Sequence, residues 1–211
     1  MLRRISAKDR TLLAVYEHAV DTGRVGPAAN TVLFSHATGF HGHIFDTTIR
    51  ALRDTRCLSM DHRGHGRSAW APHHPSHLDF DWRTFGDDVG TVLGSVNGVN
   101  GGSVLGVGHS FGATALIMAA LRSPHLFRGL VLYEPVMLPP LARAVVSFLI
   151  HMGLDSPLAA RTRKRRTHFP SRQAALDNFS SKQPMKLFHP DVVRDYVRYG
   201  LSSVEEEGAG E

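Results

Sequence analysis

The sequence predicts an α/β protein, a mostly parallel sheet flanked by helices, and three observations lead to this. Short apolar runs that are typical of buried strands occur at residues 31–35, 56–60, 103–107 and 130–133, after a β-prone segment at residues 11–18. Runs with apolar residues at helical spacing lie between them, at residues 44–53, 82–96 and 113–121. Strands of this length that alternate with helices form βαβ units, in which the strands run parallel.

The character of the chain changes after residue 136. No further strand-like run follows, and the remaining segments are an apolar helix, a basic run and two polar amphipathic helices, at residues 141–152, 161–166, 172–179 and 191–201. We therefore expect a core at residues 1–136, a helical cap segment at residues 137–204 and a disordered acidic tail at residues 205–211.

The composition indicates a globular protein without a membrane-spanning segment. The 211 residues are 42% hydrophobic and 20% charged, and the single cysteine, Cys57, excludes an internal disulfide. No apolar run approaches the ~18 residues of a membrane span. Residues 1–4 carry charge without the apolar stretch of a secretory signal. We expect a cytoplasmic location and no membrane partner; the oligomeric state stays open.

The net charge of +5 could indicate an acidic partner, and much of the excess lies in the basic run at residues 161–166. A basic nucleic-acid-binding domain would show interleaved aromatic residues, a zinc finger or an RNP-like motif, and none is present. The many histidines form no ligand string such as H-E-x-x-H. We therefore expect no nucleic-acid partner, no metal and no organic cofactor.

The most informative motif is G-x-S-x-G at residues 108–112, between a predicted strand and a predicted helix. In a nucleophile elbow, the sharp turn requires small neighbours and projects the serine hydroxyl above the sheet. Ser110 is then the nucleophile, and the backbone N–H of Phe111 is one oxyanion donor. Thr38, with Ala37 as the next candidate, would supply the second N–H from the loop after residues 31–35. The alternative is an ordinary glycine-rich loop.

Three motifs together resemble the α/β-hydrolase fold superfamily, of the type with a small helical cap. They are the H-x-x-G-F-type oxyanion loop at residues 36–40, the string D-x-R-G-H-G-x-S at residues 61–68, and G-x-S-x-G at residues 108–112. The aromatic and acidic group that the family tends to carry before the elbow strand is matched by Phe85, Asp87 and Asp88. The resemblance covers residues 11–136. It implies that His36, Arg63 and His65 order loops rather than transfer protons.

The resemblance also implies a reaction class. A serine at position 110 disfavours epoxide opening and halide displacement, which use an aspartate there. Hydrolysis of a small carboxylic ester-like substrate through an acyl-enzyme is implied instead, and thioester, lactone, amide or C–C bond hydrolysis would use the same groups. The expected partner is a small-molecule substrate.

The catalytic acid and base of the superfamily are not both found in this chain. Glu134, directly after residues 130–133, is the expected acid, and the alternative is a carboxylate that only contacts backbone. No convincing catalytic histidine follows: His151, His168 and His189 lie in cap segments, and His109 points away from the serine. We therefore expect a truncated chain that lacks the last strands and has doubtful activity. A non-catalytic binding protein of the same fold is the alternative.

Overall fold

A computed structural model gives the structure of the protein. It describes residues 1–18, 31–68, 82–96, 99, 101–139, 141, 142, 144, 146, 148, 152 and 166–203. The expected acidic tail, most of the basic run and His151 lie outside the described residues, as does much of the expected helix at residues 141–152.

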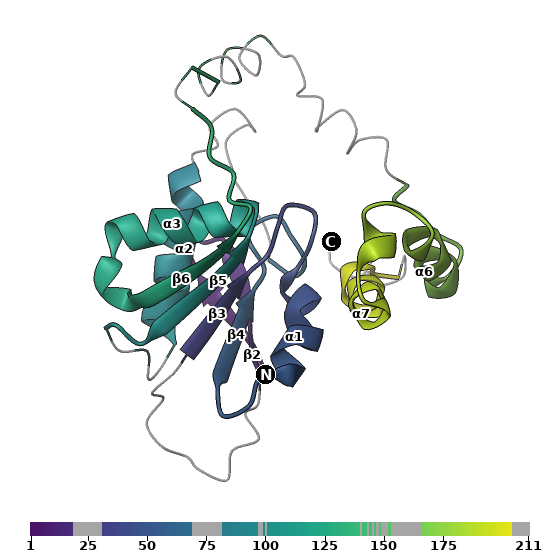
Figure 1. The fold of residues 1–211 in the computed structure, drawn as a ribbon, viewed down its shortest axis with the longest axis horizontal. Coiled ribbons are helices and arrows are strands. Elements are labelled where there is room, and N and C mark those ends of the chain that lie inside the picture. The colour runs from purple at the N-terminus through teal and green to yellow at the C-terminus, as the bar shows by residue number, and fades with distance from the viewer. Residues whose placement is uncertain are drawn as a thin grey trace.

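The described residues form a six-stranded sheet with helices on both faces, as Figure 1 shows. The strands are β1 (Leu2–Ser6), β2 (Leu12–His18), β3 (Thr31–Ser35), β4 (Arg56–Met60), β5 (Val104–His109) and β6 (Phe127–Tyr133). They lie in the order β1-β2-β4-β3-β5-β6. Strands β3 to β6 run parallel to one another, whereas β2 is antiparallel to both β1 and β4. The predicted α/β class with a mostly parallel sheet is confirmed.

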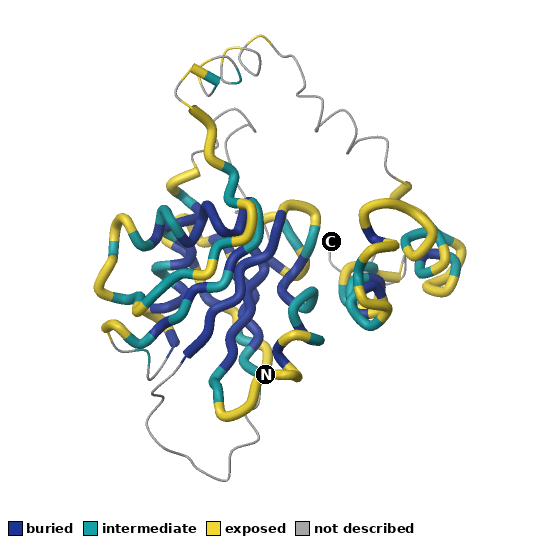
Figure 2. Tube along the Cα trace, viewed as in Figure 1, coloured by how far each residue is buried: buried dark blue, intermediate teal, exposed yellow. Residues whose placement is uncertain are grey.

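Two helices cover one face of the sheet and a shorter helix covers the other (Figure 1). Helices α2 (Trp82–Ser95) and α3 (Phe111–Arg122) pack on the larger core, to which Phe85, Val89 and Leu116 belong. Helix α1 (Asp46–Ala51) follows the 3-10 helix η1 (Gly42–Phe45) and packs Ile49 on the opposite face. Figure 2 shows that the buried residues are concentrated in the strands between these layers.

One strand was not predicted from the sequence. Strand β1 pairs with β2 at the edge of the sheet, and its sequence, LRRIS, buries only Ile5. Arg3 instead donates to Glu17 on β2 at 2.6 Å. An edge strand with charged side chains lacks the continuous apolar pattern of a central strand, so hydrophobicity alone does not reveal it.

The described elements after β6 are helical, apart from turns. Helix α6 (Arg172–Ser180), the 3-10 helix η4 (Met185–Leu187) and helix α7 (Pro190–Gly200) follow one another. The two predicted amphipathic helices are confirmed in these positions. Of the helices that the structure describes, none combines the length and the apolar character needed to cross a bilayer.

Strand β6 forms the other edge of the described sheet. Its residues alternate between the two faces: Leu130 and Leu132 pack against the larger core, whereas Val131 and Tyr133 are 53% and 66% exposed. The short 3-10 helix η3 (Pro124–Leu126) connects α3 to this strand.

Candidate active site

The turn between β5 and α3 holds Ser110 in a strained backbone conformation. Its φ of 52° and ψ of −115° lie outside the regions that a side chain ordinarily allows. The Ser110 N–H donates to the Tyr133 carbonyl at 2.8 Å, which ties the turn to β6. The side chain is half-buried at the carboxyl end of the central strands. This arrangement is the one expected for a nucleophile elbow.

Two glycines allow the elbow to form. A Cβ added to Gly108 would lie 2.6 Å from the Ala113 Cα, and one added to Gly112 would lie 2.3 Å from the Ser35 carbonyl oxygen. Both neighbours are backbone atoms, which cannot rotate away. Helix α3 therefore starts directly against the end of β3 because position 112 has no side chain.

We predict that Gly112→Ala destabilises the fold by about 1–3 kcal/mol, since the new methyl group must displace backbone. Urea unfolding measures the change. The matched control is Gly94→Ala: Gly94 is exposed in α2, and its added Cβ would meet nothing within 4 Å. The control is expected to be neutral or to stabilise by up to about 1 kcal/mol. Equal effects at the two glycines would contradict the steric explanation.

The two expected oxyanion donors lie on neighbouring segments at the carboxyl edge of the sheet. Phe111 begins α3, where the first backbone N–H groups have no partner within the helix. Thr38 lies in a tight turn closed by a hydrogen bond from the Phe40 N–H to the Ala37 carbonyl, at 3.1 Å. Gly39 takes the positive φ of 79° in that turn. Strands β3 and β5 are adjacent, so this loop and the elbow leave the sheet side by side.

His36 orders this loop, as its surroundings show. The side chain is fully buried; its Nδ1–H donates to the Ala37 carbonyl at 2.8 Å, and its Nε2 accepts from the His62 backbone N–H at 3.0 Å. Burial lowers the pKa of His36 well below its usual range, with the nearby His65 adding to the effect. The ring is therefore neutral. The expectation that His36 holds the loop is confirmed.

A second buried histidine, His62, is linked to the turn at Ser110 through the Ser35 hydroxyl. The Ser35 hydroxyl donates to the Gly112 carbonyl at 3.0 Å, so His62 Nε2–H donates to the same hydroxyl oxygen at 2.8 Å. Burial likewise lowers the pKa of His62 well below its usual range. This link joins β3, the loop after β4 and the first turn of α3.

The loop at residues 61–68 is structural. Asp61 accepts from the Tyr16 hydroxyl at 2.6 Å, from the Gly42 N–H at 2.6 Å and from the Arg67 N–H at 2.8 Å. Burial, together with the adjacent Asp61 carboxylate, raises the pKa of Tyr16 well above its usual range. The loop is thereby tied to β2 and to the start of η1. Sequence reasoning gave Asp61 no separate role, because two of these partners, Tyr16 and Gly42, are far away in the chain.

The same loop carries a buried ion pair. Arg63 donates to both carboxylate oxygens of Asp88, at 2.6 and 2.7 Å, and both side chains are 2% exposed. Arg63 also donates to Asp9 at 2.6 Å, and His65 Nδ1–H donates to the Arg63 carbonyl at 3.1 Å. The expectation that Arg63 and His65 hold loops is confirmed, and Asp88 is the acidic partner.

Glu134 follows β6 beside the elbow. His109 is paired with Tyr133 in the parallel register, which places Glu134 next to Ser110 in the adjoining strand connection. The residue is exposed and has a positive φ of 47°. The described residues give its carboxylate no hydrogen bond to a histidine.

The described residues also bring no histidine to the Ser110 hydroxyl. The His109 ring lies against Tyr133, with 5.4 Å between the ring centroids. His168 interacts with the adjacent Thr167, and His189 accepts from the Asp191 N–H at the start of α7. These histidines have local contacts, as the sequence suggested.

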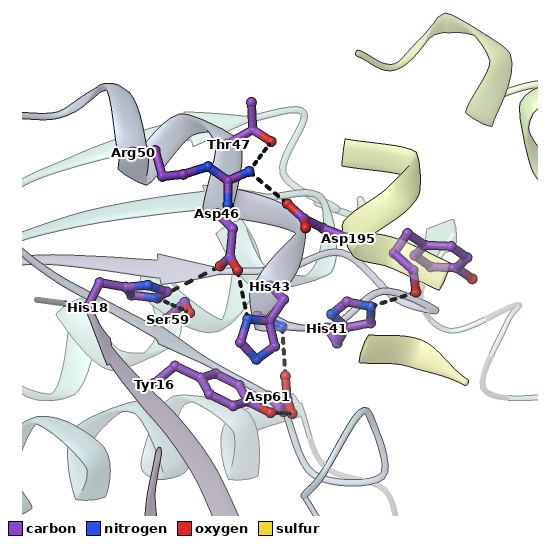
Figure 3. Close-up of polar contacts among 12 residues, drawn as sticks. Tyr16, His18, His41, His43, Asp46, Thr47, Arg50, Ser59, Asp61 and Asp195 are labelled. Carbon is purple, nitrogen blue, oxygen red and sulfur yellow. Dashed lines mark hydrogen bonds and ion pairs between the residues drawn. The ribbon is translucent and has the colours of Figure 1, made fainter. Parts of the chain in front are cut away.

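A cluster of histidines, aromatic residues and carboxylates joins α7 to η1 and α1, and sequence reasoning missed it (Figure 3). His41 Nε2–H donates to the Tyr196 carbonyl at 3.1 Å, and Arg50 donates to Asp195 at 3.0 Å. His43 Nδ1 contacts the Asp46 carboxylate at 2.9 Å. Among the described residues, no three histidine, cysteine or acidic side chains are arranged to hold a metal ion.

The mostly parallel sheet and the turn at Ser110 can be compared with known proteins. Residues 32–205 match the family model described as the alpha/beta hydrolase family. The protein belongs to the alpha/beta hydrolase family.

Individual relatives are distant. The chain is 31% identical over 118 residues to lipase LipV of Mycobacterium tuberculosis, a match covering 56% of this chain and 41% of that protein. It is 33% identical over 107 residues to a monoglyceride lipase homolog of monkeypox virus, covering 50% of this chain and 38% of that protein. The matched parts are therefore well under two thirds of these relatives.

The solved structure of E-2-(acetamidomethylene)succinate hydrolase is similar in fold. It superposes with a TM-score of 0.69 at 21% identity, over 97% of this chain and 66% of that one. This likeness shows the fold of the chain and nothing more specific.

Proposed function

We propose that this protein is a serine hydrolase that cleaves a small carboxylic ester-like substrate. The observation that carries the proposal is the strained conformation of Ser110 between β5 and α3, with glycines where the turn allows no side chain. Strain of this kind is kept where it exposes a reactive group. The family membership and the two lipase relatives favour ester hydrolysis.

In the proposed reaction the Ser110 hydroxyl oxygen attacks the ester carbonyl carbon as its proton passes to a base. The developing oxyanion accepts hydrogen bonds from the backbone N–H groups of Phe111 and Thr38. Collapse of the tetrahedral intermediate expels the alcohol, which takes up the proton, and leaves an acyl-serine. Water then releases the carboxylic acid and restores the hydroxyl.

We assign Glu134 as the acid that would orient the base, because it follows the strand next to the elbow strand. The proposal requires a histidine that reaches Ser110 from outside the described residues. We further propose that residues 1–136 form the catalytic core and residues 137–204 a cap that shapes the acyl pocket, in a cytoplasmic protein.

The test is covalent labelling of the purified protein with a fluorophosphonate probe. Labelling is expected in the wild type, and its loss is expected in Ser110→Ala, since the probe reacts only with an activated serine. Ser123→Ala, at the other end of α3, is the matched control and should label like the wild type. Labelling that persists in Ser110→Ala would contradict the assignment of the nucleophile.

A non-catalytic binding protein of the same fold is the second candidate. It is favoured by one observation: no described side chain hydrogen-bonds the Ser110 hydroxyl. A wild-type protein that unfolds cooperatively on heating but takes up no probe would establish this reading over the first.

A further inference from the structure

We propose that Tyr196 on α7 is a positioning residue that fixes the oxyanion loop, residues 36–40. The inference rests on the proposed function, because it concerns the loop that would supply the Thr38 N–H. The Tyr196 hydroxyl donates to the Gly39 carbonyl at 3.2 Å. This contact joins the carboxyl-terminal helices directly to the turn beside the elbow.

The tip of the loop projects away from the core. Thr38 and Gly39 are exposed, whereas His36 and Ala37 are buried in the sheet edge. Within the loop, the tip is held by the turn hydrogen bond from the Phe40 N–H to the Ala37 carbonyl. An N–H that must point at a developing charge needs a fixed peptide plane. The contact from Tyr196 holds the Gly39–Phe40 peptide. The N–H of that peptide donates to the Ala37 carbonyl, which lies in the same peptide plane as the Thr38 N–H, so the restraint reaches the donor through the turn.

The Tyr196 ring is itself firmly held over the loop. It stacks on His41 with 5.6 Å between centroids and an interplanar angle of 13°, and it meets the Phe40 ring edge-on at 5.4 Å. The backbone carbonyl of Tyr196 accepts from His41 Nε2–H. One residue of α7 therefore contacts three successive residues of the chain, 39 to 41.

Neighbouring contacts hold α7 in the same place. Asp195, which is 9% exposed, pairs with Arg50 of α1, as Figure 3 shows. Tyr199 stacks on His43 with 3.8 Å between centroids. These contacts dock the helix, and the Tyr196 hydroxyl is the group that reaches the oxyanion loop.

The test compares Tyr196→Phe with Tyr199→Phe, each of which removes only a hydroxyl. The Tyr199 hydroxyl has no hydrogen-bond partner among the described residues, so the second variant is the matched control. Two measurements are made: the rate of hydrogen exchange at the Phe40 amide, and the fluorophosphonate labelling of Ser110, separated into initial binding and the bond-forming rate constant.

We expect Phe40 exchange to be about 3–10-fold faster in Tyr196→Phe, as for the loss of one hydrogen bond. The bond-forming rate constant should fall about 3–10-fold with initial binding unchanged, because the donor is aligned less well. Tyr199→Phe should change both by less than about twofold.

The outcomes separate this inference from the proposed function. Unchanged Phe40 exchange in Tyr196→Phe overturns the inference, whatever the labelling shows. Faster exchange with unchanged labelling in a protein that does label overturns the link to the Thr38 donor. If the wild type takes up no probe, the proposed function fails, and exchange alone decides whether Tyr196 fixes the loop.

Discussion

Replacing Arg63 with methionine is expected to lower the free energy of unfolding by about 3–5 kcal/mol. The substitution leaves the Asp88 carboxylate buried, at 2% exposure, without the guanidinium that neutralises it. Burial already raises the pKa of Asp88, although Arg63 opposes this, so the loss of Arg63 favours a protonated carboxyl further. Urea denaturation at neutral pH measures the change.

The neighbouring position offers a matched control. Asp87 pairs with Arg122 at the surface, where the two side chains are 37% and 46% exposed. Arg122→Met should cost less than about 1 kcal/mol, as exposed ion pairs do. The double variant Arg63→Met with Asp88→Leu should recover much of the stability, because it removes the buried charge. Equal effects of the two arginine substitutions would contradict the importance of burial.

The second large effect is a loss of stability in mild acid. Burial lowers the pKa of five histidines below the usual value near 6.5: His18, His36, His41, His62 and His65. The folded protein therefore binds fewer protons than the unfolded chain. The resulting loss in the free energy of unfolding is absent above about pH 6.5 and grows as the pH falls below that value.

Each such group lowers the free energy of unfolding by up to about 1.4 kcal/mol per pH unit. The fully buried His36 and His62 alone should remove about 3 kcal/mol between pH 7.5 and 5.5. The pKa of Asp9, about 2, lies far below this window, so that carboxylate stays charged throughout. Urea titrations at three pH values measure the slope.

A variant tests the assignment. His62→Gln keeps a side-chain N–H for the Ser35 hydroxyl but cannot be protonated. The loss in the free energy of unfolding as the pH falls should therefore be smaller by the contribution of one histidine, ~1.4 kcal/mol per pH unit. A free energy of unfolding that stays constant from pH 7.5 to 5.5 would contradict the prediction that these histidines stay neutral in the folded protein.

Much of the fold could be predicted because it is encoded locally. Strands β3 and β4 occupy the predicted residues, since each is a short run of buried side chains between turns. The sharp turn at Ser110 could be predicted for the same reason: Gly108 and Gly112 lie where the backbone approaches too closely for a side chain. Strand β1 escaped prediction because Arg3 and Arg4 interrupt its apolar pattern.

The candidate site could be predicted only in part. Ser110 and the loop around Thr38 lie in recognisable motifs, whereas the Asp61 hydrogen bonds and the contacts of Tyr196 join residues far apart in the chain. Tyr196 lies on the predicted amphipathic helix at residues 191–201. The spacing of apolar residues in that helix does not indicate which surface of the protein the helix contacts. The stacking of Tyr196 on His41 could not be predicted from the local sequence around either residue.

The contacts of Tyr196 also set an order of events during synthesis. They span 155 residues to His41 and 157 residues to Gly39. At roughly 5–20 residues per second, the ribosome needs about 8–30 s to make the chain between the loop and its restraint. The turn at residues 37–40 and the elbow at Ser110 both emerge within that interval. Both turns are thus synthesised well before the last described helix, whose Tyr196 contacts the first of them.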